Sequence, residues 1–185
     1  MAEEMALSVV YAVDTDHVLG ALTLTGASAP TTAAALVGPA LPLRVSLGTG
    51  RTATLPVDAR ELAVAPVDDE PGALGEPLAY AIERGTSDDG TQAKPKPRLL
   101  HLPSWTGGLD LTTDDLTVTV PLPTTTTARV VALISDDQAT HVLAGEIPAD
   151  RNTVKLPVSL AGDTTYGVLV LVSGWAGRLE KAAVA

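Results

Sequence analysis

Short runs of Val, Leu and Thr recur along this chain, and each run is bounded by Gly, Pro or Asp. This spacing is typical of all-β proteins, whereas βαβ units would place a longer helical segment between successive strands. We expect strands at 6–13, 18–25, 41–48, 51–57, 60–67, 78–83, 115–121, 127–134, 140–147, 153–160 and 166–173. The sequence therefore predicts an all-β fold of two small antiparallel β-sandwich-like modules packed together.

Two of these runs predict how their strands are buried. Residues 116–120 alternate apolar residues with Thr, so Leu116, Val118 and Val120 should face a core and the threonines solvent. The run Val168–Val172 is apolar on both faces. It is either a central strand covered on both sides or part of an interface, which makes three of its residues interface candidates: Val168, Val170 and Val172.

Few segments favour other structures. Thr32–Leu36 is Ala-rich and precedes Gly38 and Pro39, which indicates a short helix, and the tail Arg178–Ala185 is either a second short helix or irregular. Gly48–Thr52 predicts a hairpin turn rather than a phosphate-binding loop, because its glycines join two β-runs and no helix follows.

The connector at 84–108 is the best domain boundary, because its first half is polar and then rich in Pro. We expect one β-module at 1–83 and a second, with a C-terminal tail, at 109–185. Residues 8–57 and 129–172 also resemble each other: in each a Val-rich run, an acidic turn, a His-Val-Leu run and a later Leu-x-Val-Ser-Leu run follow in order. The similarity is either an internal duplication or a chance resemblance between two Val-rich segments.

Composition excludes several function classes. The chain has 185 residues, no Cys, no Phe, two Trp and three Tyr. The absence of Cys excludes thiolate chemistry, and so few aromatic rings argue against the stacking sites that bind sugars and single-strand nucleic acid. A net charge of -10 opposes binding to nucleic acid or to anionic membranes. The acidic start and the lack of a long apolar run predict a cytoplasmic protein, either free or within an assembled particle.

Two acidic turns are the sharpest candidates for a binding site. Their carboxylates and histidines, which hard cations or zinc could use, are Asp14, Asp16, His17, Asp136, Asp137 and His141. Aspartates are also common in turns between strands, so solvated turns are the competing interpretation. We predict no catalytic residues, no enzyme activity and no cofactor, because no serine lies in a Gly-x-Ser-x-Gly elbow and no helix-linked glycine loop exists.

Both tryptophans lie beside glycines. Trp105 and Trp175 are either lids over the end of a core or anchors in a protein interface. With so little chemistry in the sequence, the leading hypothesis is a non-catalytic structural protein that docks, with copies of itself or other proteins, into an oligomer such as a shell or a phage-tail-like machine. Its tails, Met1–Ala6 and Gly177–Ala185, would then be arms that reach neighbouring subunits. The alternative is a ligand- or metal-binding β-module that uses the Asp/His turns.

Overall fold

The computed structural model describes residues 6–25, 30–83 and 97–184. Strands dominate, and every strand pair with a defined register is antiparallel. The elements in chain order are β1 (Ala6–Ala12), β2 (Val18–Leu24), α1 (Ala33–Val37), β3 (Ala40–Gly48), β4 (Arg51–Asp58), η1 (Ala59–Glu61), β5 (Leu62–Val67), α2 (Gly72–Gly75), η2 (Pro77–Ala79), β6 (Tyr80–Glu83), β7 (Arg98–His101), β8 (Leu109–Leu111), β9 (Asp115–Thr119), β10 (Ala128–Ser135), β11 (Thr140–Ile147), β12 (Thr153–Pro157), β13 (Thr165–Val172) and β14 (Arg178–Ala183). The predicted all-β class is confirmed.

The chain forms two compact units, which we call the first and second unit. The first comprises Met1–Leu41 and Asp58–Leu102, and the second Pro42–Val57 and Pro103–Ala185. Most of the hairpin β3–β4 thus belongs to the second unit. In the expected connector, residues 98–101 form β7, and residues 84–96 lie outside the described residues.

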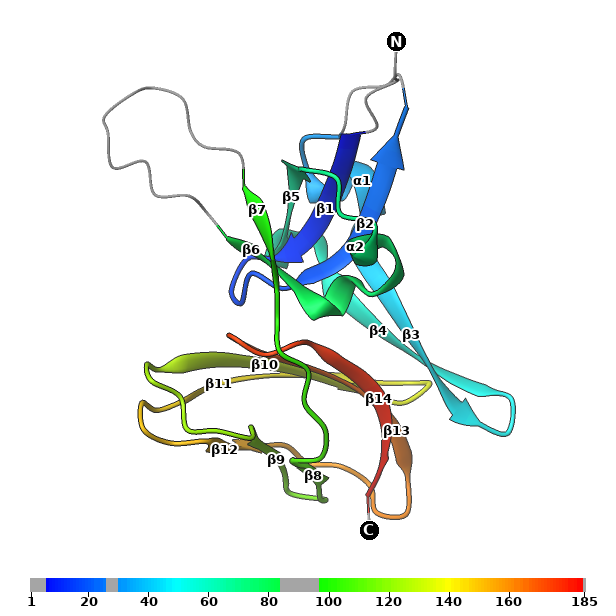
Figure 1. The fold of residues 1–185 in the computed structure, drawn as a ribbon. Coiled ribbons are helices and arrows are strands. Elements are labelled where there is room, and N and C mark those ends of the chain that lie inside the picture. The colour runs from blue at the N-terminus through cyan, green and yellow to red at the C-terminus, as the bar shows by residue number, and fades with distance from the viewer. Residues whose placement is uncertain (1–5, 26–29, 84–96, 185) are drawn as a thin grey trace. The chain divides into compact units, whose positions relative to one another are not determined.

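The first unit contains a three-stranded sheet in the order β2-β1-β5 and a two-stranded sheet, β6-β7 (Figure 1). Alternate residues of β1 and β5 point to one side, where they meet residues from β2, α2 and β6. This core consists of Leu7, Val9, Val18, Ala65, Val67, Ala73, Tyr80 and Ile82. A bridge between His17 and Ala81 ties β6 to the start of β2.

The second unit contains a four-stranded sheet in the order β11-β10-β13-β14 and a three-stranded sheet in the order β12-β9-β8, which form separate layers in Figure 1. Buried residues of both sheets belong to one hydrophobic cluster. Leu116, Val118 and Val120 lie in this cluster, as the alternation predicts, while Thr117 and Thr119 stay partly exposed. Gly145 lets the layers approach, since a Cβ there would lie 2.5 Å from Leu156 Cδ2.

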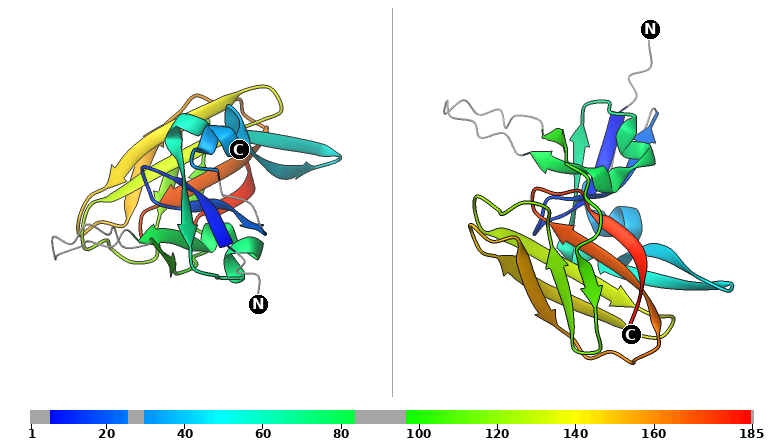
Figure 2. Two further views of the ribbon diagram at one scale, coloured as in Figure 1. Left: turned by 90° about the horizontal axis from the view of Figure 1, so that it is seen from above. Right: turned by 60° about the horizontal axis from the view of Figure 1, so that its bottom comes forward.

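The strand β13 is a central strand with both faces buried. Val168, Val170 and Val172 point into the hydrophobic cluster, and Leu169 on the opposite face is fully buried. The hairpin β3–β4 covers part of that opposite face, because a Cβ on Gly167 would lie 2.9 Å from the Cβ of Ala53. Figure 2 shows this hairpin from two further directions. The hairpin therefore accounts for the cover of the opposite face at Gly167.

The predicted short helix and the predicted hairpin turn are both confirmed. The helix α1 begins after Thr32, whose Oγ1 accepts the N–H of Ala35, and ends at Gly38 with a φ of 73°. The turn between β3 and β4 places Gly48, Thr49 and Gly50 at positive φ, the conformation for which glycine is favoured in tight hairpins.

The tail does not form the second helix that its composition favours. Residues Arg178–Ala183 form β14, paired along its whole length with β13. The turn before it uses Gly174 at a φ of 88°, and the exposed edge of β13 then offers hydrogen bonds that outweigh the helix propensity of Leu, Glu, Lys and Ala. The C-terminal tail is thus a strand of its own sheet and no free arm over those residues.

The duplication stays a prediction. Hairpins β1–β2 and β10–β11 do occupy matching places in their sheets, because β1 also pairs with β5 and β10 with β13. The later matched runs differ, since β3 pairs with β4 whereas β12 pairs with β9.

Candidate functional site

The acidic turn between β10 and β11 is held by its own hydrogen bonds. One oxygen of Asp136 accepts the N–H groups of Gln138 and Ala139, each at 2.7 Å. The bond from Ala139 is the main cause that lowers the pKa of Asp136 below its ordinary value. Asp137 forms an ion pair with Arg51 of the hairpin at 3.2 Å, and His141 lies half-buried on β11. Both carboxylates are thus engaged in shaping and fastening the turn.

Beneath this turn lies the buried hydroxyl of Ser135. Its Oγ lies 3.0 Å from the carbonyl oxygen of Thr54 on β4, 3.1 Å from that of Ala139 and 2.9 Å from Thr140 Oγ1. The bond to Thr54 joins the hairpin β3–β4 to the end of β10. The hydrogen bonds of this Asp-rich turn and of the buried Ser135 hydroxyl thus serve to connect and stabilise neighbouring strands.

The acidic turn between β1 and β2 differs from its counterpart. Asp14 is exposed, Asp16 has a φ of 61°, and His17 is fully buried with an exposed fraction of 0%. Burial takes this histidine away from solvent, whereas His141 remains accessible. Among the residues that the structure describes, no three His, Cys, Asp or Glu side chains are grouped so that they could hold a metal ion.

The two tryptophans have different surroundings. Trp105 is 6% exposed and belongs to the core of the second unit. Its Nε1 donates to the carbonyl of Ala176 at 2.9 Å, and the guanidinium of Arg178 lies 4.5 Å from the ring centre. These contacts make Trp105 a lid over the core. The interface candidates Val168, Val170 and Val172 are core residues as well, so they offer no exposed surface.

Trp175 is partly buried and lines a shallow groove of about 380 Å³. The other walls are the Thr-rich loop 122–128 and the turn 173–174. Leu122 on its rim is 64% exposed, while Thr124 is fastened by hydrogen bonds to Pro148 and Arg151. Trp175 is thus a predicted interface residue that borders a surface depression.

The outer edge of β14 is a site that sequence reasoning missed. The Val184 amide donates to the carbonyl of Thr164, which continues the ladder between β13 and β14. In an antiparallel ladder, residues alternate between bonding to the neighbour and pointing away. Counting back from Val184, the N–H and C=O groups that point away from β13 belong to Leu179, Lys181 and Ala183.

Nothing in the described part of the chain pairs with these groups through the backbone. The segment before β8 covers only the beginning of β14: Ala176 donates to the carbonyl of Pro103, and the guanidinium of Arg178 donates to the carbonyl of Gly107. Beyond this point Lys181 and Ala183 are exposed. The edge is therefore open where an extended segment could pair with it.

The open edge carries one uncompensated charge. Glu180 accepts two hydrogen bonds from Arg178, the shorter at 2.7 Å, so these two charges balance each other. No ion pair to Lys181 is found among the described residues. The residue opposite Lys181 on β13 is Gly167, which has no side chain that could contact the ammonium group. The ammonium of Lys181 is thus available to whatever lies along the edge.

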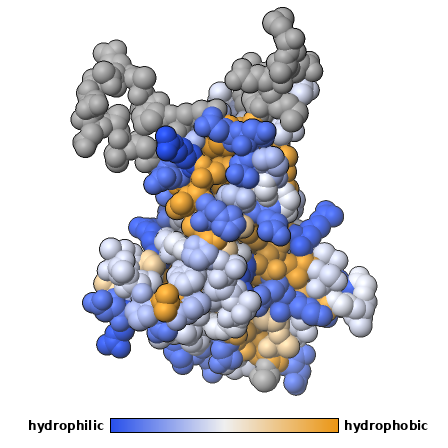
Figure 3. Space-filling model, viewed as in Figure 1, coloured by the Kyte–Doolittle hydropathy of each residue, from blue (hydrophilic) through white to orange (hydrophobic). Residues whose placement is uncertain are grey.

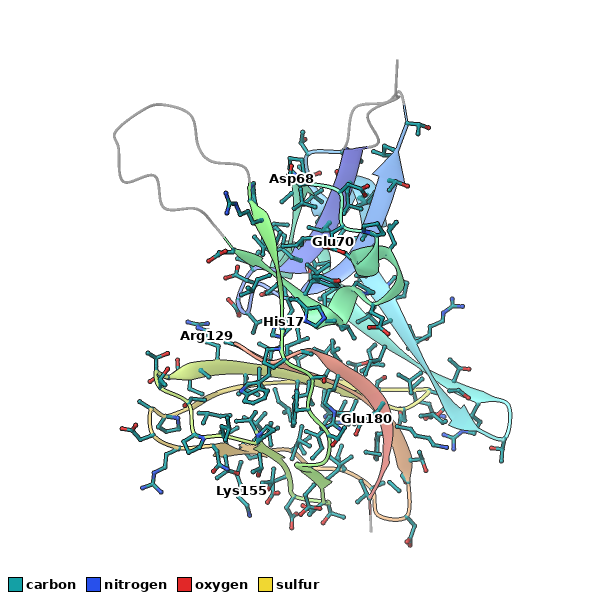
Figure 4. All side chains as sticks on the ribbon, in the orientation of Figure 1. His17, Asp68, Glu70, Arg129, Lys155 and Glu180 are labelled. Atoms are coloured by element: carbon teal, nitrogen blue, oxygen red, sulfur yellow. The ribbon has the colours of Figure 1, made fainter. Side chains whose placement is uncertain are left out.

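The second unit has another open edge for comparison, on β12. The Val120 amide donates to the carbonyl of Asn152, so Thr153, Lys155 and Pro157 point away from β9 by the same alternation. Pro157 has no N–H to offer, and Lys155 is paired with Asp115 at 3.2 Å. Figure 4 labels Lys155 and Glu180, one on each sheet of this unit. The edge of β12 is thus blunted by proline and by a neutralised charge, unlike that of β14.

The surface of the second unit in the view of Figure 3 is mostly polar, with small hydrophobic areas. Among the described residues, no helix has the length and apolar character needed to cross a membrane.

Comparison with known proteins finds no matching family model, no matching curated protein and no matching solved structure. Function has therefore to be inferred from the geometry of this chain's own residues.

Proposed function

We propose that this chain is a non-catalytic structural module that joins a larger protein assembly by accepting an extended strand of a partner at the open edge of β14. The observation that carries this proposal is the row of outward-pointing backbone groups at Leu179, Lys181 and Ala183. Strand addition to a sheet edge supplies main-chain hydrogen bonds without a deep pocket.

The sheet behind this edge is suited to such a role. Its central strand β13 is buried on both faces, and the Trp105 lid and Arg178 hold the start of β14 in place. A rigid edge loses little conformational freedom on binding, because the strand that receives the partner is already ordered. An added strand would extend the four-stranded sheet β11-β10-β13-β14 by one.

Several polar side chains that could carry chemistry have structural partners instead. Asp136, Asp137 and Ser135 are used to shape a turn and to fasten the hairpin β3–β4. His101 packs edge-to-face against the ring of Tyr80. These contacts stabilise the fold and need no substrate to explain them.

Amide hydrogen exchange tests the proposal. The chain is measured alone and after purification of the complex that it forms in an extract of its source. In the complex, exchange at Leu179, Lys181 and Ala183 should slow by at least about tenfold, because their amides gain hydrogen-bond acceptors. Exchange at Thr153 and Lys155 on the edge of β12 should not change, which makes that edge the matched control. A complex that leaves all three β14 amides unprotected would refute the proposal.

A further inference from the structure

The hairpin β3–β4 has one apolar face and one polar face. Along β4, Ala53, Leu55 and Val57 are buried and alternate with exposed residues, and β3 alternates in the same way up to the buried Leu47. A two-stranded hairpin by itself is at best marginally stable in water. This hairpin therefore needs a surface that covers its apolar face.

The sheet β11-β10-β13-β14 supplies such a surface at Gly167. A Cβ on this glycine would lie 2.9 Å from the Cβ of Ala53, 3.2 Å from Leu55 Cδ1 and 3.4 Å from the Cβ of Val45. The missing side chain thus leaves the space in which the apolar face of the hairpin packs. Ala53 and Leu55 are fully buried as a result.

No main-chain ladder fixes the hairpin to this sheet. In the described part of the chain, β3 and β4 form a two-stranded sheet of their own. Two polar links join the hairpin to the end of β10: Ser135 Oγ donates to the carbonyl of Thr54 at 3.0 Å, and Arg51 pairs with Asp137 at 3.2 Å. The hairpin can therefore leave as one piece without breaking the strand pairing of the sheet.

The hairpin and the sheet that it covers are separate segments of the chain. The chain leaves the first unit between Leu41 and Pro42 and returns to it between Val57 and Asp58, and the rest of the second unit begins only at Pro103. A second copy presents an identical sheet, so placing the hairpin there would reproduce the same contacts. The chain connection and the protein concentration then decide which sheet the hairpin covers.

We infer that the hairpin β3–β4 is an exchangeable arm whose partner is a second copy of the chain: two copies place their hairpins on each other's sheets and form a closed two-fold dimer. Exchange of an identical element between protomers is a low-cost route to a dimer. This exchange uses the face of the sheet at Gly167 and not the edge of β14, so it is independent of the proposed function. In the dimer, Arg51 of one copy forms its ion pair with Asp137 of the other.

A charge-exchange experiment tests the inference with the full chain. Arg51→Asp leaves two acidic residues at 51 and 137, and Asp137→Arg leaves two basic ones, so each variant alone opposes like charges both as a monomer and as a dimer. In an exchanged dimer of the two variants, both pairs become opposite in charge. Sedimentation equilibrium of the equimolar mixture should therefore show a heterodimer about five- to thirtyfold tighter than the dimer of either variant alone.

The ion pair between Lys155 and Asp115 provides the matched control. Both residues lie on paired strands of one sheet, β12 and β9, which cannot separate without unfolding the second unit. A mixture of Lys155→Asp and Asp115→Lys should therefore form no heterodimer. Circular dichroism should show the same strand content in all four variants, because each of the four side chains reaches the solvent.

The rate of association distinguishes exchange from a contact between folded surfaces. The hairpin must leave its own sheet before it can cover another, so mild urea should accelerate formation of the heterodimer. A heterodimer that forms at once on mixing, and that urea does not accelerate, would be a surface contact and would overturn the inference. A mixture that stays as monomeric as its two components, or a control pair that associates equally well, would overturn it as well.

Discussion

Replacing Gly108 by alanine should destabilise the second unit far more than the same replacement of its neighbour Gly107. Both glycines have nearly the same left-handed backbone, with φ of 71° and 68°. A Cβ on Gly107 would meet nothing within 4 Å, whereas one on Gly108 would lie 2.0 Å from the carbonyl oxygen of Thr119. The pair therefore separates the cost of backbone conformation from the cost of a clash.

The magnitudes follow from these contacts. Alanine in the left-handed region costs about 1–2 kcal/mol at either position. At Gly108 the strands must also separate, which adds roughly 1–3 kcal/mol of overpacking. Separation would stretch the 2.7 Å hydrogen bond from the Thr119 amide to the Gly108 carbonyl, worth about 1 kcal/mol. We expect a loss of about 1–2 kcal/mol for Gly107→Ala and about 3–6 kcal/mol for Gly108→Ala.

Urea unfolding followed by tryptophan fluorescence measures both values. Trp105 and Trp175 are the only tryptophans of the chain, and both belong to the second unit, so the signal reports on that unit alone. Equal losses for the two variants would show that the close approach of Gly108 to Thr119 does not exist. The account of how β8 joins β9 would then be wrong.

Two predictions concern the turn between β10 and β11 and use the same fluorescence assay. Ser135→Ala should lower the free energy of unfolding by about 1–3 kcal/mol, because the carbonyl of Thr54 loses its buried hydrogen-bond donor. The control Ser46→Ala, at an exposed position, should change it by no more than about 0.5 kcal/mol. Equal effects of the two substitutions would contradict the role of Ser135 as a buried anchor. The pKa of Asp136 is lower in the folded than in the unfolded chain, so its contribution to stability is complete above pH of about 4 and is lost as the pH falls through the folded value. Carboxylates titrate roughly between pH 5 and pH 2.5. As the pH falls through this range, Asp136→Ala should therefore lose less stability than the wild type. Parallel plots of unfolding free energy against pH for the two proteins would refute the role of the Ala139 hydrogen bond.

The strands that could be predicted are those whose own residues define them. Leu116, Val118 and Val120 alternate with threonines, and Gly48 and Gly50 mark a turn that no other residue type forms as easily. Local pattern and tertiary structure agree at these places, so the sequence alone is sufficient. The same agreement explains why α1 could be recognised from its alanines and Gly38.

The strands β7, β8 and β14 could not be predicted, because their own residues do not define them as strands and they exist through their pairing with β6, β9 and β13. β8 has three residues, Leu109–Leu111, and exists through its ladder with β9. β14 consists mostly of helix formers and becomes a strand only because β13 presents a free edge after the Gly174 turn. The open edge itself depends on the order of strands in the sheet, which no local pattern contains.

Residue type and neighbouring sequence do not decide the roles of the candidate site residues. Both tryptophans lie beside glycines, yet Trp105 closes the core while Trp175 lines a groove. His17 and His141 begin similar runs, but only His17 is buried. Burial decides such cases, and it follows from packing between strands that are far apart in the sequence.

The most direct test of the open edge is the amide exchange pattern along β14 in the free chain, measured residue by residue by NMR. Glu180 and Ala182 should exchange slowly, because their N–H groups donate to β13. Leu179, Lys181 and Ala183 should exchange at least about tenfold faster, because their N–H groups point to solvent. This alternation is what the account predicts; uniformly slow exchange along the strand would mean that the edge is already covered, and would contradict it.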